Sequence, residues 1–241
     1  MRTYKSLFIV LLVSAVFLSA CGSTAQQGSQ LQPRTINVNG TSQVLVSPDI
    51  AYVSIGVHSE AEAAKAAVEA NNDQSQAVID ALLAGGVDAK DIQTTNFSIY
   101  PQDKYSPTGE LLGKFYAVDN TVYVKVRDLE GLGGLLDAAV DAGANNIYGI
   151  TFDLDNKDAA IEQGRKEAVE KARQQAEQLA AEAGITVGDV YSISAYSSAP
   201  VPMNYYDVKG LGGVSEALAS VPIATGQLTI TVDVNVVFEI K

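Results

Sequence analysis

The fold is decided by residues 120–193, which begin NTVYVKVRDLEGLGGLLDAAVDAGANNIYGITFDL. Residues 120–127 alternate apolar and polar side chains, as a half-buried strand does. A helix is expected over 129–142 and a second strand over 146–154. A long helix rich in Ala, Glu, Lys and Gln follows over 158–183, before a third strand. The stretch therefore predicts strand, helix, strand, helix, strand.

The rest of the chain repeats this alternation of strands and helices. The further elements that the patterns predict are strands over 35–46 and 50–58, a helix over 60–84, a strand over 92–100 that Pro101 ends, and a last strand over 224–240. Three helices end at a glycine and a strand follows each time, at Gly86, Gly143 and Gly184. These are the marks of successive βαβ units.

The predicted fold class is α+β, a layered sandwich. Successive βαβ units favour parallel strands, whereas hairpins at 46–50 and 101–114 favour antiparallel ones, so we expect a mixed β-sheet with long helices packed on one face. Small residues such as Ala168, Ala172 and Ala176 recur along the helix at 158–183 and would let its backbone approach the sheet closely. The expected domain covers 35–241, with room for two α+β subdomains, the second near 114–190.

The N-terminus carries an export signal. Arg2 and Lys5 precede an apolar run over 7–20 that is too short to span a bilayer well. The run ends in LSACG, which resembles a bacterial lipobox, so residues 1–20 are expected to be a lipoprotein signal peptide and Cys21 the lipidated residue. Cys21 is the single cysteine and can form no internal disulfide. The alternatives are an ordinary secretory signal with an incidental cysteine, or a buried helix.

The mature chain is strongly acidic. The whole sequence has a formal net charge of −12, and removal of Arg2 and Lys5 with the signal peptide makes it −14. Such a chain is repelled by nucleic acid and by anionic lipid headgroups, so we expect no nucleic acid partner and a membrane contact made by the lipid alone. Residues 21–34 are rich in Ser, Gln and Gly, and are expected to be a flexible tether.

An ordered set of motifs resembles one known family. The matching segments are INVNG at 36–40, PDIAYV at 48–53, DIQT at 91–94, KFYAVDNTVYVKVRD at 114–128, DAGANN at 141–146, GITF at 149–152 and AVEKAR at 168–173. Together they resemble the SIMPL domain family, also called DUF541. The resemblance extends over residues 34–240, nearly the whole mature chain.

The resemblance implies an exported protein of the bacterial cell envelope, facing the periplasm or the cell exterior. Some members of the family are linked to defence against oxidative stress, and some assemble into large oligomers. The family has no established active-site residues, so none are carried over, and the resemblance implies no cofactor. A homo-oligomer or an envelope protein partner is therefore expected rather than an enzyme activity.

Three sequence features are candidates for a catalytic, metal-binding or phosphate-binding site. His58 is the single histidine, and neither a catalytic triad nor a zinc site can be built around it from the sequence, which favours a surface residue. Residues 153–158 (DLDNKD) begin like a calcium loop but then lack the glycine and the glutamate, which favours a helix N-terminus. The glycine runs at 131–134 and 210–213 lack the spacing of phosphate loops. We therefore predict no catalytic, cofactor-binding or metal residues.

A long irregular segment over 197–222 interrupts the pattern of strands and helices. It holds Met203, Tyr205 and Tyr206, side chains of the kinds that are enriched at interfaces. We take these three as candidate interface residues. The alternative function is a small-ligand-binding or enzymatic domain whose pocket this segment closes.

Overall fold

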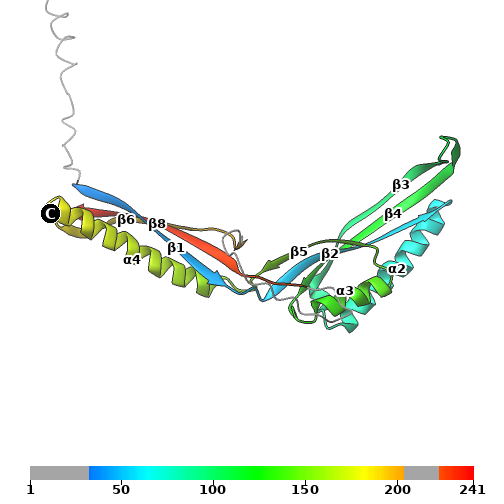
Figure 1. Cartoon of the computed structure of the whole chain (residues 1–241), viewed down its shortest axis with the longest axis horizontal. Helices are drawn as coiled ribbons and strands as arrows, with labels where there is room; N and C mark the ends of the chain where they lie inside the picture. Colours follow the sequence, from blue (N-terminus) through cyan, green and yellow to red (C-terminus); the bar gives the residue numbers. More distant parts are fainter. Residues whose placement is uncertain (1–32, 204–222) are drawn as a thin grey trace, which may run out of the picture. The chain divides into compact units, whose positions relative to one another are not determined.

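The computed structural model describes residues 33–203 and 223–241, and contacts group Thr35–Lys241 into one compact unit. Its described residues form two four-stranded antiparallel sheets and three α-helices, and each sheet has its own hydrophobic core (Figure 1). The predicted α+β layered architecture is confirmed.

The first sheet has the strand order β1-β8-β6. Its strands are β1 (Thr35–Val46), β8 (Leu228–Ile240) and β6 (Val187–Ser197), and the short β7 (Val201–Pro202) also pairs with β8. Every second residue of β8 from Leu228 to Phe238 is buried, as the alternation in the sequence predicts. The helix α4 (Asp158–Glu182) packs on this buried face.

The contact between α4 and β1 depends on the absence of side chains. Ala168, Ala172 and Ala176 are fully buried along the helix, as the stripe of small residues predicts. A Cβ atom built on Gly40 of β1 would lie 1.8 Å from the carbonyl oxygen of Ala168, so the two backbones are nearly in contact. A Cβ atom built on Gly164 of α4 would lie 2.7 Å from the side chain of Val232. Glycine and alanine thus set the distance between helix and sheet.

The second sheet has the strand order β3-β4-β2-β5. Its elements, in chain order, are β2 (Ile50–Ala61), α2 (Ala64–Ala84), the 3₁₀ turn η2 (Ala89–Asp91), β3 (Ile92–Tyr105), β4 (Leu111–Val126), α3 (Leu132–Asp141) and β5 (Asn146–Asp153). This is the ferredoxin-like, split β-α-β topology. The helices α2 and α3 pack on one face, over Val53, Ile55 and Val57 of β2.

The prediction of one mixed sheet is wrong, because every strand pairing in the described residues is antiparallel. The strand-helix-strand units exist, but their strands are not neighbours: β4 lies between β2 and β3, and β2 lies between β4 and β5. The turn at 106–110 causes this, since it folds β4 back into the gap that a simple βαβ unit would close.

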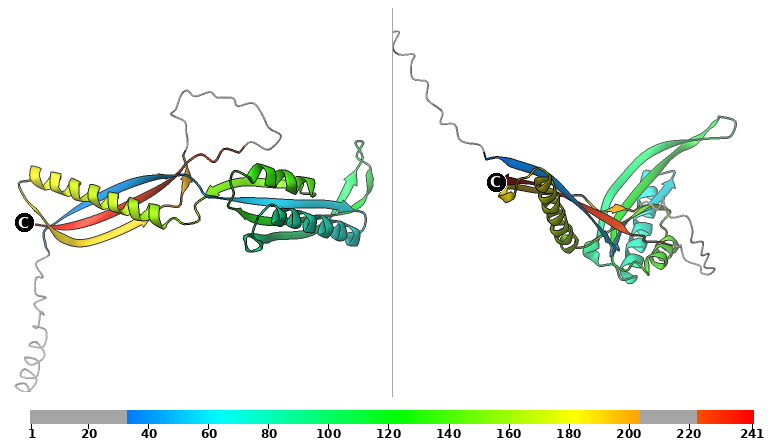
Figure 2. Two further views of the ribbon diagram at one scale, coloured as in Figure 1. Left: turned by 90° about the horizontal axis from the view of Figure 1, so that it is seen from below. Right: turned by 60° about the vertical axis from the view of Figure 1, so that its left-hand side comes forward.

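The hairpin of β3 and β4 is longer than the sequence predicts. Pro101 does not end β3, which continues to Tyr105, because β3 is an edge strand and tolerates a residue without an N–H group. The last residue of β2, Ala61, pairs with Tyr116, so residues 101–115 extend past the sheet as a two-stranded arm (Figure 2). We call these residues the hairpin arm.

Candidate functional site

The face of the second sheet opposite α2 and α3 carries a polar cluster. On β2 the side chains alternate, so Val57 enters the core while His58 lies on the open face. Strand register places Asp119 of β4 directly opposite His58. Tyr100, on the neighbouring β3, reaches the same point with its hydroxyl group. Three strands thus bring together a histidine, a carboxylate and a phenol.

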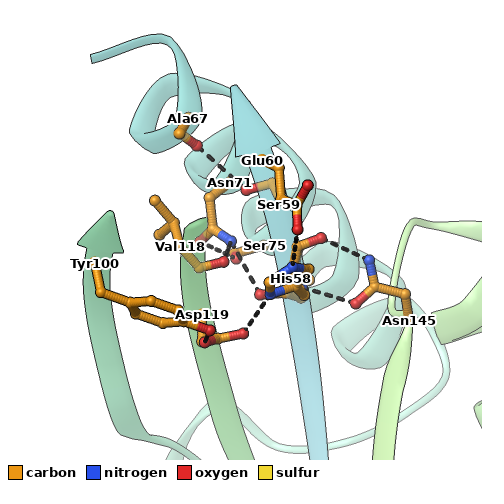
Figure 3. A network of polar contacts seen from close by, with 11 residues as sticks. His58, Ser59, Glu60, Ala67, Asn71, Ser75, Tyr100, Val118, Asp119 and Asn145 are labelled. Atoms are coloured by element: carbon orange, nitrogen blue, oxygen red, sulfur yellow. Dashed lines mark hydrogen bonds and ion pairs between the residues drawn. The ribbon is translucent and has the colours of Figure 1, made fainter. Parts of the chain in front are cut away.

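Asp119 is the centre of this cluster (Figure 3). One of its oxygens, Oδ1, lies 2.7 Å from Nδ1 of His58, and the other accepts a 2.9 Å hydrogen bond from the Tyr100 hydroxyl. On the far side of the imidazole, Nε2 lies 3.3 Å from a carboxylate oxygen of Glu60. The imidazole is therefore held between two carboxylates.

This geometry changes the protonation of the ring. The hydrogen bond to Asp119 raises the pKa of His58 above its ordinary value, against the opposing effect of partial burial, and Glu60 adds to the rise. The hydrogen bond to Asp119 also raises the pKa of Tyr100. Both groups consequently keep their protons more firmly than free side chains do, with Asp119 as the shared acceptor.

Two asparagine side chains form hydrogen bonds with the backbone around the cluster (Figure 3). Asn145 accepts a 2.7 Å hydrogen bond from the His58 backbone N–H and donates one of 2.7 Å to its carbonyl oxygen. Asn71 of α2 is fully buried and donates to the carbonyl oxygens of Val57 and Val118 at 2.9 and 3.1 Å. The segments that carry His58 and Asp119 are thereby fixed by α2 on the core face and by the turn before β5 beside β2.

A hollow of about 690 Å³ lies over this cluster. The residues that line it come from all four strands and the turn before β5: His58, Asn96, Tyr100, Asp119, Thr121, Asn145, Asn146 and Tyr148. All of these side chains carry hydrogen-bonding groups, and two are tyrosines. The arrangement suits a polar ligand more than an apolar one.

The sequence singled out only His58 of this cluster. Asp119 is 61 residues away from it and Asn145 is 87, so their proximity depends on strand pairing that no local pattern reveals. The one available signal was the alternation on each strand, which assigns His58, Tyr100 and Asp119 to the solvent side of their strands.

Acidic side chains of segment 153–158 bind lysine and arginine side chains of the same chain. Asp153 accepts a 2.8 Å bond from Lys157, and Asp155 pairs with both Lys125 and Arg127. The Asn156 side chain accepts the backbone N–H of Asp158 at 2.8 Å, at the start of α4. Within residues 33–203 and 223–241, no group of three or more His, Cys, Asp and Glu side chains is arranged to hold a metal ion.

The remaining sequence candidates are only partly described. Gly131 donates its N–H to Asp128 at 3.0 Å and opens α3, as expected of a turn into a helix. Met203 is 40% exposed, and its N–H donates to the Gln227 carbonyl at 3.0 Å. Cys21, Tyr205, Tyr206 and the glycine run at 210–213 lie outside the described residues. Among the described helices, none has the length and apolar character needed to cross a membrane.

Comparison with known proteins gives a consistent result. The sequence model described as "SIMPL: Protein of unknown function (DUF541)" matches residues 36–238. The chain is 37% identical to the "26 kDa periplasmic immunogenic protein" of Brucella melitensis, over 96% of this chain and 94% of that protein. It is 31% identical to the "Uncharacterized protein YggE" of Escherichia coli K12, over 78% and 77% of the two chains. A YggE protein of Edwardsiella ictaluri is 28% identical over 80% of each chain.

Proposed function

Because the chain belongs to the SIMPL (DUF541) family, we propose that it is a lipid-anchored, non-enzymatic protein of the bacterial cell envelope that acts by self-assembly. The printed name of the Brucella relative, a periplasmic protein, supports the location. We propose that it serves in envelope or oxidative stress defence, the role that the resemblance implies for some members of the family.

Lipidation of Cys21 is the anchor in this proposal. It is supported by the basic start, the apolar run and the LSACG segment. Each buried CH₂ of an acyl chain contributes about 0.8 kcal/mol, so more than one chain gives a lasting anchor. Cys21→Ser should move the protein from the membrane fraction to the soluble fraction. An unchanged membrane fraction would rule out the lipid anchor.

The observation that carries self-assembly is the apolar end of the hairpin arm. Tyr105, Leu111 and Leu112 are 59%, 57% and 61% exposed there. The arm is also electrically neutral in an acidic chain, since Asp103 and Glu110 balance Lys104 and Lys114. An exposed apolar and uncharged projection is typical of a contact surface.

The surface that suits this arm is an apolar groove between α3 and β5. It has a volume of about 460 Å³ and is lined by Leu136, Asp137, Val140, Ile147, Gly149 and Ile150. Its single charged residue faces an arm without net charge, so no strong repulsion opposes docking. We propose that the arm of one copy enters the groove of a second copy. Contacts between two different surfaces of the same chain repeat, and so build rings or filaments.

The expected strength of one such contact is modest. Burial of about 100 Å² on each of the three arm side chains contributes roughly 7 kcal/mol at about 25 cal/mol per Å². Loss of translational and rotational freedom opposes this by about 4–15 kcal/mol. Confinement to a membrane raises the effective concentration of neighbouring copies and lowers that opposing term. The lipid anchor therefore strengthens a contact that the arm and the groove also make without it.

The non-enzymatic part of the proposal rests on the surroundings of His58. In a catalytic triad, the nitrogen that does not face the aspartate must face a nucleophile. Here that nitrogen, Nε2, faces the Glu60 carboxylate at 3.3 Å. A carboxylate in this position holds the proton on the ring and offers no hydroxyl or thiol for activation.

The test is site-directed disulfide cross-linking in the envelope. Cys21 is the single cysteine and is consumed by the lipid, so introduced cysteines are the only free thiols. A chain with Leu112→Cys and a chain with Val140→Cys should form disulfide-linked dimers when they are expressed together. Each variant expressed alone should form few such dimers. Leu112→Cys with Tyr196→Cys, a β6 residue of the other sheet, is the matched control. Equal cross-linking of both pairs, or of neither, would refute docking of the arm in the groove.

A further inference from the structure

We propose that the hollow over His58 and Asp119 binds a neutral, polyhydroxylated ligand, a sugar chain. The inference is independent of assembly, because no residue of the hairpin arm (101–115) and no residue that lines the groove between α3 and β5 also lines this hollow. It starts from the lining, which joins planar polar side chains with tyrosine rings.

Hydrogen-bonding capacity remains free in the hollow. Within the part of the chain that the structure describes, the side chains of Asn96 and Asn146 make no hydrogen bond, and both line the hollow. Asp119 accepts one bond on each oxygen, from His58 and from Tyr100. A carboxylate has about four lone-pair sites, so roughly two remain for a ligand. Amides and carboxylates are planar groups that can engage two adjacent hydroxyl groups at once.

The aromatic side chains supply the second half of the site. Tyr100 is fixed by its bond to Asp119, and Tyr148 is 57% exposed on the opposite edge strand, β5. On the same face, Tyr52 and Tyr123 stack with ring centroids 5.2 Å apart. Exposed rings beside hydrogen-bonding groups suit a ligand with both an apolar face and polar edges, such as a sugar ring.

The charges of the cluster select against other ligands. Anions are disfavoured because Asp119 lines the hollow and Glu60 lies 3.3 Å from His58, in a chain of formal net charge −12. Cations are disfavoured because both carboxylates already face the imidazole of His58. Apolar ligands would leave the amide and carboxylate groups of the lining without partners. A neutral ligand with many hydroxyl groups satisfies all three conditions.

The test uses the mature chain and a short soluble oligomer of N-acetylglucosamine. His58 is the single histidine, so its imidazole signals in an NMR titration report on this hollow alone. The oligomer should shift those signals saturably. Tyr148→Ala should raise the Kd about 3- to 10-fold, the equivalent of losing one aromatic contact. Asn96→Ala, at a second exposed position, should also raise it, whereas Tyr196→Ala on β6 should leave it unchanged.

Three results would overturn the proposal: no saturable shift of the His58 signals, an affinity that Tyr148→Ala and Asn96→Ala leave unchanged, or shifts produced equally by putrescine or inorganic phosphate. Thermal unfolding of each variant verifies that the fold is intact. Pull-down with purified cell-wall sacculi then identifies the source. Retention on sacculi indicates wall glycan, and binding of the soluble oligomer alone indicates a free saccharide.

Discussion

Replacement of Gly40 by alanine should destabilise the protein far more than its small size suggests. The new Cβ atom would lie 1.8 Å from the carbonyl oxygen of Ala168, where an ordinary contact needs at least 3.4 Å. The backbone nitrogen of Ala172 is also only 2.8 Å from that position. Both obstacles are main-chain atoms of α4, so no side chain can rotate out of the way.

The helix must therefore move away from β1 by about 1.6 Å, the difference between 3.4 and 1.8 Å. A gap of 0.5–1 Å already removes about a quarter to a half of a dispersion contact. The gap would extend along the buried alanines of α4, and overpacking commonly costs about 1–3 kcal/mol. We expect a loss of about 3 kcal/mol or more, which is roughly a hundredfold or greater change in the folding equilibrium.

The matched control is the same chemical change at Gly134. No atom lies within 4 Å of a Cβ built there, and the residue is within α3. Alanine is favoured over glycine inside a helix by about 1 kcal/mol, so Gly134→Ala should stabilise. Urea unfolding followed by far-ultraviolet circular dichroism measures both. If Gly40→Ala unfolds within about 1 kcal/mol of wild type, the close packing of α4 on β1 is wrong.

Three further predictions concern the second sheet. The pKa of His58 should lie above 6.5 in an NMR titration, and Asp119→Asn should lower it, because the hydrogen bond to Asp119 is the main cause of the shift. An unchanged pKa in the variant would contradict the hydrogen bond between His58 and Asp119. This pKa is raised on folding, so the stabilising effect of His58 should be complete below the unfolded pKa of about 6.5 and lost as pH rises through the folded pKa. The advantage of wild type over His58→Gln in urea midpoint should therefore be largest below about pH 6.5 and shrink at higher pH. Asn71→Ala removes both N–H donors to the Val57 and Val118 carbonyls and should lower the free energy of unfolding by about 2–4 kcal/mol. Ser75→Ala loses one 3.3 Å hydrogen bond and should lower it by about 1 kcal/mol. Equal losses of stability in the two variants would mean that Asn71 does not stabilise the fold through these bonds.

The buried faces of the elements were largely predictable from the sequence. The face of β8 from Leu228 to Phe238 and the alanines of α4 follow directly from periods of two and 3.6 residues. Exceptions arise at the margins of the α4 stripe. Leu179 fits the stripe by its spacing from Ala172 and Ala176 but is 49% exposed, because the buried positions of α4 recur at every fourth residue from Ala168 to Ala180.

Polar core residues escaped the same reasoning. Asn71 and Ser75 lie on the buried face of α2, where an apolar pattern would predict Ala70 and Ala77. Asn71 is buried because main-chain carbonyl groups of β2 and β4 need donors there, and Ser75 donates its hydroxyl to the Asn71 side chain at 3.3 Å. Such a requirement is created by the fold and leaves no hydrophobic signal in the sequence.

Neither the strand order nor the candidate site could be predicted from the sequence, for a related reason. Glycine after each helix correctly indicates a return to the sheet, but it does not say which strand the next one joins. The insertion of β4 beside β2 depends on a register between residues far apart in the chain. That same register brings Asp119 opposite His58, so the site could be recognised only once the pairing was known.

The most direct test of the proposed self-assembly is the solution mass of the mature chain with Cys21→Ser, measured by size exclusion with light scattering. The proposal predicts a discrete multiple of the mass of one chain. The double change Leu111→Asp and Leu112→Asp should reduce it to a single chain, because it places charges on two of the three exposed apolar residues of the hairpin arm. A wild-type protein that stays monomeric, or an oligomer that survives the double change, would contradict assembly through the arm.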